Sequence, residues 1–185
     1  GGMIVVQNAN TAATTPRDYR HQSGSASTRN GTSSVTGRVL QLGNASTASQ
    51  QSFNIQGVIP NLVLTNNGGN NTATFGAAVT WNNITRNITI ETGTTMNFGN
   101  LVFLMNGVTL TNNGTLTHTG AASRFIWFLA DSPQTYTGTG TVTAPMTSFE
   151  AQNGGVILDP AVSNIVVRRI ILFVRGITNA NKHTL

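Results

Sequence analysis

Few side chains in this chain of 185 residues could take part in acid–base chemistry. The carboxylates number five, and they are Asp18, Glu91, Asp131, Glu150 and Asp159. Enzymes that cleave polysaccharides on β-helical scaffolds need several carboxylates on one face, either as acid and base or as ligands of Ca²⁺. Folding could still pair Asp131 with Glu150 or Glu91, so this enzyme class stays an alternative. The simpler interpretation places Glu91 and Glu150 on strands, facing water.

The histidines give no metal-binding pattern. His21, His118 and His183 lack the short spacings of metal ligands, and we expect His118, within Thr117-His118-Thr119, to lie at the surface. The absence of cysteine excludes disulfides and thiol catalysis. We therefore predict no catalytic residue, no cofactor and no metal site.

Basic residues are sparse as well. The net charge of +5 and the isoelectric point of about 11.2 arise from only fifteen charged residues. Nucleic-acid-binding proteins usually carry a dense basic stripe, whereas the clusters here are Arg17 with Arg20 and Arg168-Arg169 with Arg175. We expect no nucleic-acid partner. No stretch of about 18 apolar residues predicts a membrane span, and no signal peptide is visible.

Composition favours strands and turns. Thr, Asn and Gly occur 29, 22 and 20 times, whereas Glu occurs twice and Lys once. Thr suits strands, and Asn and Gly suit sharp turns. Because 38% of the residues are hydrophobic and only 8% are charged, a folded chain without long helices is expected.

A short sequence motif recurs along the chain, and it indicates where in the fold the residues discussed above lie. Residues 61–68 read NLVLTNNG, residues 87–93 read NITIETG, and residues 107–114 read GVTLTNNG, followed at once by TLT. Such spacing, with several short strands in each period, is typical of stacked solenoids. We predict an all-β, right-handed parallel β-helix or β-solenoid over residues 53–185. Residues 1–52 would form an N-terminal strand and a loop-rich cap.

Alternation within the phrases predicts the core. Apolar residues alternate with Thr, so one side chain points inward and the next outward. The predicted inward residues are Leu62, Leu64, Ile88, Ile90, Val108, Leu110, Leu116, Val142, Ile157, Ile165 and Val167. Residues 125–129 and 170–174 are apolar throughout, so both of their faces must be covered.

Threonine rows raise a further possibility. Residues 115–117, 137–139 and 141–143 have the T-x-T pattern of ice-binding solenoids. We expect the intervening rungs not to keep this register. Asn-x-Ser/Thr sequons also occur, but an Asn- and Thr-rich chain produces them by chance.

The ends of the chain suggest self-association. An open solenoid end exposes unpaired backbone groups and apolar side chains. The predicted contacts are Ile4, Val5, Val6, Ile171, Phe173 and Leu185. The expected partners are copies of the chain or adjacent repeats of a longer one, with cell-surface glycans as a further candidate.

One resemblance follows from residues 60–67 (PNLVLTNN), 107–117 (GVTLTNNGTLT) and 134–143 (QTYTGTGTVT). The chain resembles, over residues 53–185, the large secreted surface proteins and adhesins of Bacteroidetes-type bacteria, in which similar Asn/Thr/Gly-rich phrases repeat over a β-solenoid. This resemblance implies an extracellular, cell-surface location and transfers no catalytic residue. The chain departs from it by lacking a visible signal peptide and C-terminal sorting domain.

These observations favour an extracellular structural or adhesive β-solenoid module rather than an enzyme. We expect it to assemble into a filament or to form part of a longer surface fibre. The alternatives are a carbohydrate-active β-helix enzyme and a phage-type fibre protein.

Overall fold

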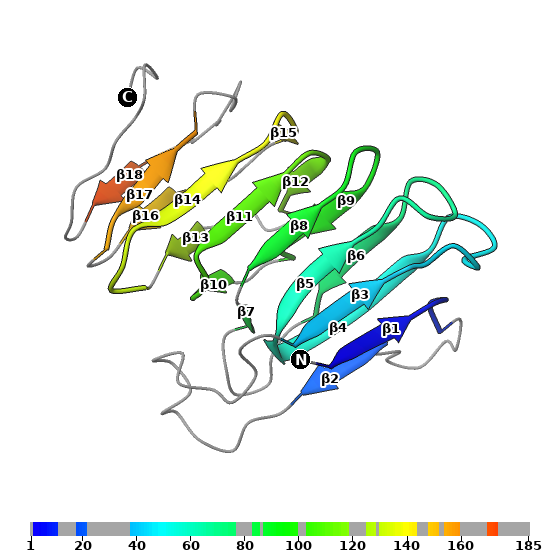
Figure 1. Ribbon diagram of the computed structural model, residues 1–185. Coiled ribbons are helices and arrows are strands. Elements are labelled where there is room, and N and C mark those ends of the chain that lie inside the picture. The colour runs from blue at the N-terminus through cyan, green and yellow to red at the C-terminus, as the bar shows by residue number, and fades with distance from the viewer. Residues whose placement is uncertain are drawn as a thin grey trace.

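The computed structural model describes residues 2–10, 18–21, 38–76, 83–85, 87–99, 103–118, 125–128, 130–143, 148–151, 154–159 and 170–173. Within these ranges the regular structure consists of strands, and no helix occurs. Every strand pairing there is parallel. The predicted fold class, an all-β parallel solenoid, is confirmed (Figure 1).

Three faces make up the coil. Face A is a sheet of seven strands, in the order β1 (Met3–Val6), β3 (Val39–Leu42), β5 (Asn61–Leu64), β8 (Ile88–Ile90), β11 (Thr109–Asn112), β14 (Gln134–Thr137) and β17 (Val156–Leu158). Face B contains β2 (Tyr19–His21), β4 (Ser52–Ile59), β6 (Thr72–Phe75), β9 (Thr95–Asn97), β12 (Thr115–Thr117) and β15 (Thr141–Val142). Face C contains the end of β4 with β7 (Asn83–Thr85), β10 (Phe103–Met105), β13 (Phe125–Phe128), β16 (Ser148–Ala151) and β18 (Ile170–Phe173).

The chain visits these faces in a fixed order. Each of four consecutive turns places one strand on face A, one on face B and one on face C, beginning with β5, β6 and β7. The long strand β4 belongs to two faces, since Ile55 pairs with β6 and Val58 pairs with β7. Between them lies Gly57, whose positive φ of 93° lets the strand turn the corner.

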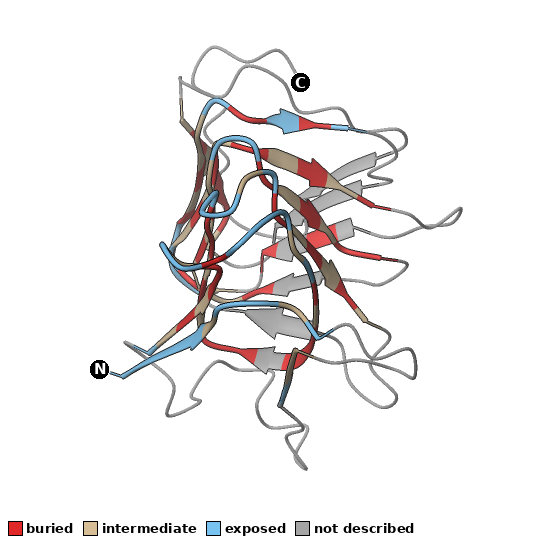
Figure 2. Cartoon of the chain, turned by 90° about the vertical axis from the view of Figure 1, so that its right-hand side faces the viewer, coloured by how far each residue is buried: buried red, intermediate tan, exposed pale blue. Residues whose placement is uncertain are grey.

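Apolar columns fill the interior. On face A, strand register places six inward residues one above the other: Leu40, Leu62, Ile88, Leu110, Tyr136 and Leu158. On face B the matching column is Phe53, Ala73, Met96, Leu116 and Val142. None of these side chains is more than 5% exposed, and Figure 2 shows the buried residues alternating along the strands. Burying one large apolar side chain contributes about 1.5–3 kcal/mol, so stacking turn on turn stabilises the coil.

Most of the predicted core residues are buried. Those confirmed are Leu62, Leu64, Ile88, Ile90, Leu110, Leu116 and Val142. Ile165 and Val167 lie outside the described residues.

Two predicted core residues were wrong. Val108 is 64% exposed, because β11 begins one residue later and the Val108 N–H is held at the corner by Asn87 Oδ1, at 2.7 Å. Ile157 is half-buried, whereas its neighbours Val156 and Leu158 are buried. Three consecutive apolar residues give no alternation, and a change of one residue in register exchanges the two faces.

Buried amides close the corners between turns. The Asn71 side chain donates to the carbonyl oxygens of Thr65 and Asn67 and accepts from the Gln51 N–H. The Gln134 amide donates to the carbonyl oxygens of Met105 and Gly107 and accepts from the Ala130 N–H. Such bonds satisfy backbone groups that the corners leave unpaired inside the protein.

The stacking also extends upstream of residue 53. Strands β1 and β3 continue face A in register, with Ile4 beside Leu40 and Val6 beside Leu42. At the other end, β13 lies between β10 and β16, with Ile126 and Phe128 buried. The outward side chains of β13, and all side chains of β18, are outside the described part of the chain.

Candidate functional site

Two carboxylates bind backbone groups. The oxygens of Asp18 accept the N–H groups of Asn10 (2.5 Å) and Asn54 (2.6 Å), and so tie the first turn to β4. Glu91 Oε2 accepts the Asn66 N–H at 2.8 Å, across neighbouring corners. Both therefore serve to hold successive turns together.

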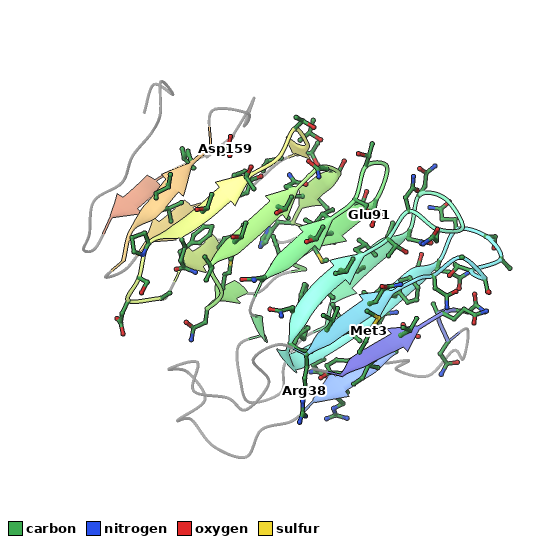
Figure 3. The ribbon with its side chains drawn as sticks, viewed as in Figure 1. Met3, Arg38, Glu91 and Asp159 are labelled. Carbon is green, nitrogen blue, oxygen red and sulfur yellow. The ribbon has the colours of Figure 1, made fainter. Side chains whose placement is uncertain are left out.

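Glu91 and Asp159 are too far apart to act as a catalytic pair. Glu91 and Asp159 follow β8 and β17, which lie three strand spacings apart, or roughly 14 Å at about 4.8 Å per step (Figure 3). Glycosidase carboxylates are about 5–9.5 Å apart. Asp131 is exposed in the loop before β14, and the side chain of Glu150 lies outside the described residues.

The position predicted for His118 was wrong. Its side chain is only 4% exposed, because it continues the inward parity of Leu116 rather than the outward parity of Thr117. The side chain of His21 and all of His183 lie outside the described residues. In the described ranges no group of three His, Asp or Glu side chains could hold a metal ion.

Strand β1 exposes an apolar surface at one end of face A. Met3, Ile4 and Val5 are 59%, 53% and 41% exposed, and Figure 2 shows this strand as exposed beside the N-terminus. Register makes Ile4 the next inward member of the Leu40 column, yet it is not covered as the others are. At the far end of the same column Leu158 is only 5% exposed.

The backbone of β1 has a free side as well. Gly2 and Val6 accept N–H groups of Val39 and Gly43, so these peptides face β3. In a parallel ladder the intervening peptides, those of Met3 and Val5, point to the opposite edge. The described part of the chain places no strand there. Among the described residues, this edge therefore combines backbone groups that no strand pairs with apolar side chains on both faces of β1.

The predicted assembly contacts fall into three groups. Ile4 and Val5 are exposed in β1, whereas Val6 is half-buried and packs against the core. Ile171 and Phe173 lie in β18, which pairs with β16, but their side chains are not described, and Leu185 lies outside the described residues. Met3 is also exposed and was not among the predicted contacts, although it begins the uninterrupted apolar run of residues 3–6. Figure 3 shows Met3 near Arg38, which is also exposed.

No helix in the described ranges has the length and hydropathy to cross a membrane. Comparison of the chain with models of known protein families, with curated proteins and with solved structures gives no match. Its function is therefore inferred from the surfaces of the coil itself.

Proposed function

We propose that this chain is an extracellular structural or adhesive β-solenoid module of the bacterial cell surface. Copies of it associate through β1 into a filament or into part of a longer surface fibre. The observation that supports this most directly is the exposed apolar edge formed by Met3, Ile4 and Val5. Cell-surface glycans are a further candidate partner.

The chemistry of β1 fits another turn of the same kind of coil. A parallel strand placed beside β1 would bind its free backbone groups, as each strand of face A binds the next. An inward apolar residue on that strand would cover Ile4. Natural edge strands usually carry charges or prolines that prevent such pairing, and Met3–Val6 has neither.

A head-to-tail contact explains how a filament would form. The two ends of a parallel coil differ, so the β1 end of one copy must bind the opposite end of the next copy. A contact of this kind need not close into a ring and can propagate. The low charge of the chain, 8% of residues, limits repulsion between copies.

Sedimentation velocity and negative-stain electron microscopy of the chain test this proposal. We expect oligomers that grow with protein concentration, and a double variant Ile4→Lys, Val5→Lys that remains monomeric. Val108→Lys is the matched control, because Val108 is also an exposed aliphatic residue but lies on the side of the coil. A chain that stays monomeric at high concentration contradicts assembly, as does equal dissociation by the control.

A further inference from the structure

The outer surface of face B carries a regular two-column array of small hydroxyl and amide side chains. Register aligns Ser52, Thr72, Thr95, Thr115 and Thr141 in the first column. The second column contains Asn54, Thr74, Asn97 and Thr117. Thr143 extends it, since its N–H binds the Leu116 carbonyl oxygen. Five successive turns thus present an S/T-x-N/T pair. The strict T-x-T pattern is broken at Ser52/Asn54 and Thr95/Asn97, as expected, but the two outward positions stay in register through all five turns.

The spacing of the array is uniform. The N–H groups of Thr72, Thr95, Thr115 and Thr141 each donate to a carbonyl oxygen of the previous turn, that of the residue just before the previous array strand, at 2.8–2.9 Å. Neighbouring members of a column are therefore one strand spacing apart, about 4.8 Å, and the two columns are about 6.6 Å apart along each strand. Such a grid is fixed by the backbone and not by flexible side chains.

The hydroxyl groups are also aligned along the axis. Thr72 Oγ1 donates to Ser52 Oγ at 3.1 Å, and the hydroxyls of Thr115 and Thr141 are 3.4 Å apart. Both columns consist of neutral side chains. Ser52, Thr141 and Thr143 are exposed, and the other members are half-buried, as expected for the outward residues of a sheet.

We propose that this array binds ice. Ice presents flat lattices of oxygen atoms whose repeats are close to the two spacings of the array. Threonine offers both a hydroxyl group, which can join such a lattice, and a methyl group, next to which water loses orientational freedom. Charged groups would orient water radially and disturb this match. From Ser52 to Thr143 neither column contains one, and the carboxylate of Asp18, which lies beside Asn54, marks the end of the second column.

Face A carries a shorter array of the same kind. Its first outward column runs Gln41, Val63, Thr89, Thr111 and Thr137. Its second column runs Val39, Asn61, Asn87, Thr109, Thr135 and Ile157. Hydroxyl or amide side chains therefore fill both columns over three turns of face A, against five turns of face B. The inference concerns face B and does not depend on association through β1.

Thermal hysteresis of the whole chain, and uptake of fluorescently labelled chain into a growing ice hemisphere, test the proposal. We expect a measurable freezing-point gap and incorporation into the ice. The variant Thr95→Lys, in the middle of the first column, should lose most of both. Thr111→Lys is the matched control, because Thr111 is also half-buried between two threonines but lies on face A. Circular dichroism establishes that both variants are folded.

Three outcomes overturn the inference: exclusion of the folded chain from ice, retention of activity in folded Thr95→Lys, and equal loss in Thr111→Lys. Binding to insoluble polysaccharide without uptake into ice overturns it too, and would assign the array to a flat glycan surface. Ile4→Lys, Val5→Lys should still enter ice as a monomer. Failure of assembly and failure of ice binding are thereby distinguishable.

Discussion

Among the described residues, the titratable side chain that is most deeply buried is that of Tyr136, in strand β14 of face A. Tyr136 is 1% exposed, and its hydroxyl accepts a hydrogen bond from Asn112 Nδ2 at 3.0 Å. The same amide donates to the Thr141 carbonyl oxygen, so it joins strands of both faces. Burial raises the pKa of Tyr136 to about 12, and the hydrogen bond from Asn112 opposes this rise in part.

This pKa predicts a loss of stability in alkali. The unfolded chain releases the Tyr136 proton near pH 10, whereas the folded chain keeps it until about pH 12. Between these values the unfolded state binds fewer protons, so the free energy of unfolding falls as pH rises, by about 3 kcal/mol in total. Urea titrations from pH 9 to 12 measure this fall. Below about pH 10, the pKa of Tyr136 in the unfolded chain, this decrease in the free energy of unfolding is absent.

Tyr136→Phe isolates the effect of this residue. The variant should lose most of the alkaline fall and cost about 1 kcal/mol at neutral pH, because Asn112 loses one acceptor. Burial also raises the pKa of Tyr19, so a smaller fall in the same direction should persist. Identical pH profiles for the variant and the parent would assign the alkaline change to other groups.

At the scale of elements, the short strands define the fold, and the corners between them determine which residues point inward and which residues align between turns. Alternation with Asn and Gly punctuation was enough to predict a parallel solenoid and the inward residues of β5, β8 and β12. It was not enough for Val156–Leu158, because a strand that is apolar throughout does not indicate which residues point inward. His118 is a different case, because the alternation of residues 115–118 does place it inward, in phase with Leu116.

The array of face B was hidden by corners of unequal length. Thr72 follows its column neighbour Ser52 by 20 residues, whereas Thr141 follows Thr115 by 26. The sequence does not indicate which corner contains the additional residues. The unequal spacing of the threonines along the chain therefore suggested that they would not align from turn to turn. Backbone pairing restores it, because only the strands, and not the corners, must stack.

The corner at Gly138 tests how closely successive turns approach. Its φ is 111°, and a Cβ atom there would overlap the backbone of Asn112 in the turn below. Gly138→Ala should therefore lower the free energy of unfolding by about 3 kcal/mol, from backbone strain and overlap together. Gly69→Ala is the control, since Gly69 has a φ of 81° but no atom within 4 Å of an added Cβ.

The control separates strain from steric overlap. Gly69→Ala should cost only the strain, about 1 kcal/mol. Chemical denaturation of both variants gives the two values. Equal losses would mean that the turns can move apart at Gly138 without cost, and that corner packing does not fix the spacing of the array.

At the scale of the whole molecule, the coil has two surfaces that face different ways. The edge of β1 is at one end of the coil and faces along its axis, whereas the array of face B lies on the side of the coil. Association through β1 would bury about half of three apolar side chains and form a few backbone hydrogen bonds. These gains amount to several kcal/mol, whereas association costs about 4–15 kcal/mol. A contact through β1 alone should therefore be weak, with a dissociation constant of about a millimolar or higher.

Weak association of this kind makes stability depend on protein concentration. A partner that binds the folded state but not the unfolded state raises the midpoint of thermal unfolding as its concentration rises. We expect this midpoint to increase with the concentration of the chain, and to be independent of it in Ile4→Lys, Val5→Lys. Val108→Lys should keep the dependence, because Val108 lies away from the edge. Differential scanning calorimetry across a concentration series measures all three. A midpoint independent of concentration in the parent chain would mean that β1 binds no second copy, and it would leave a turn of a longer chain as the element that covers Ile4.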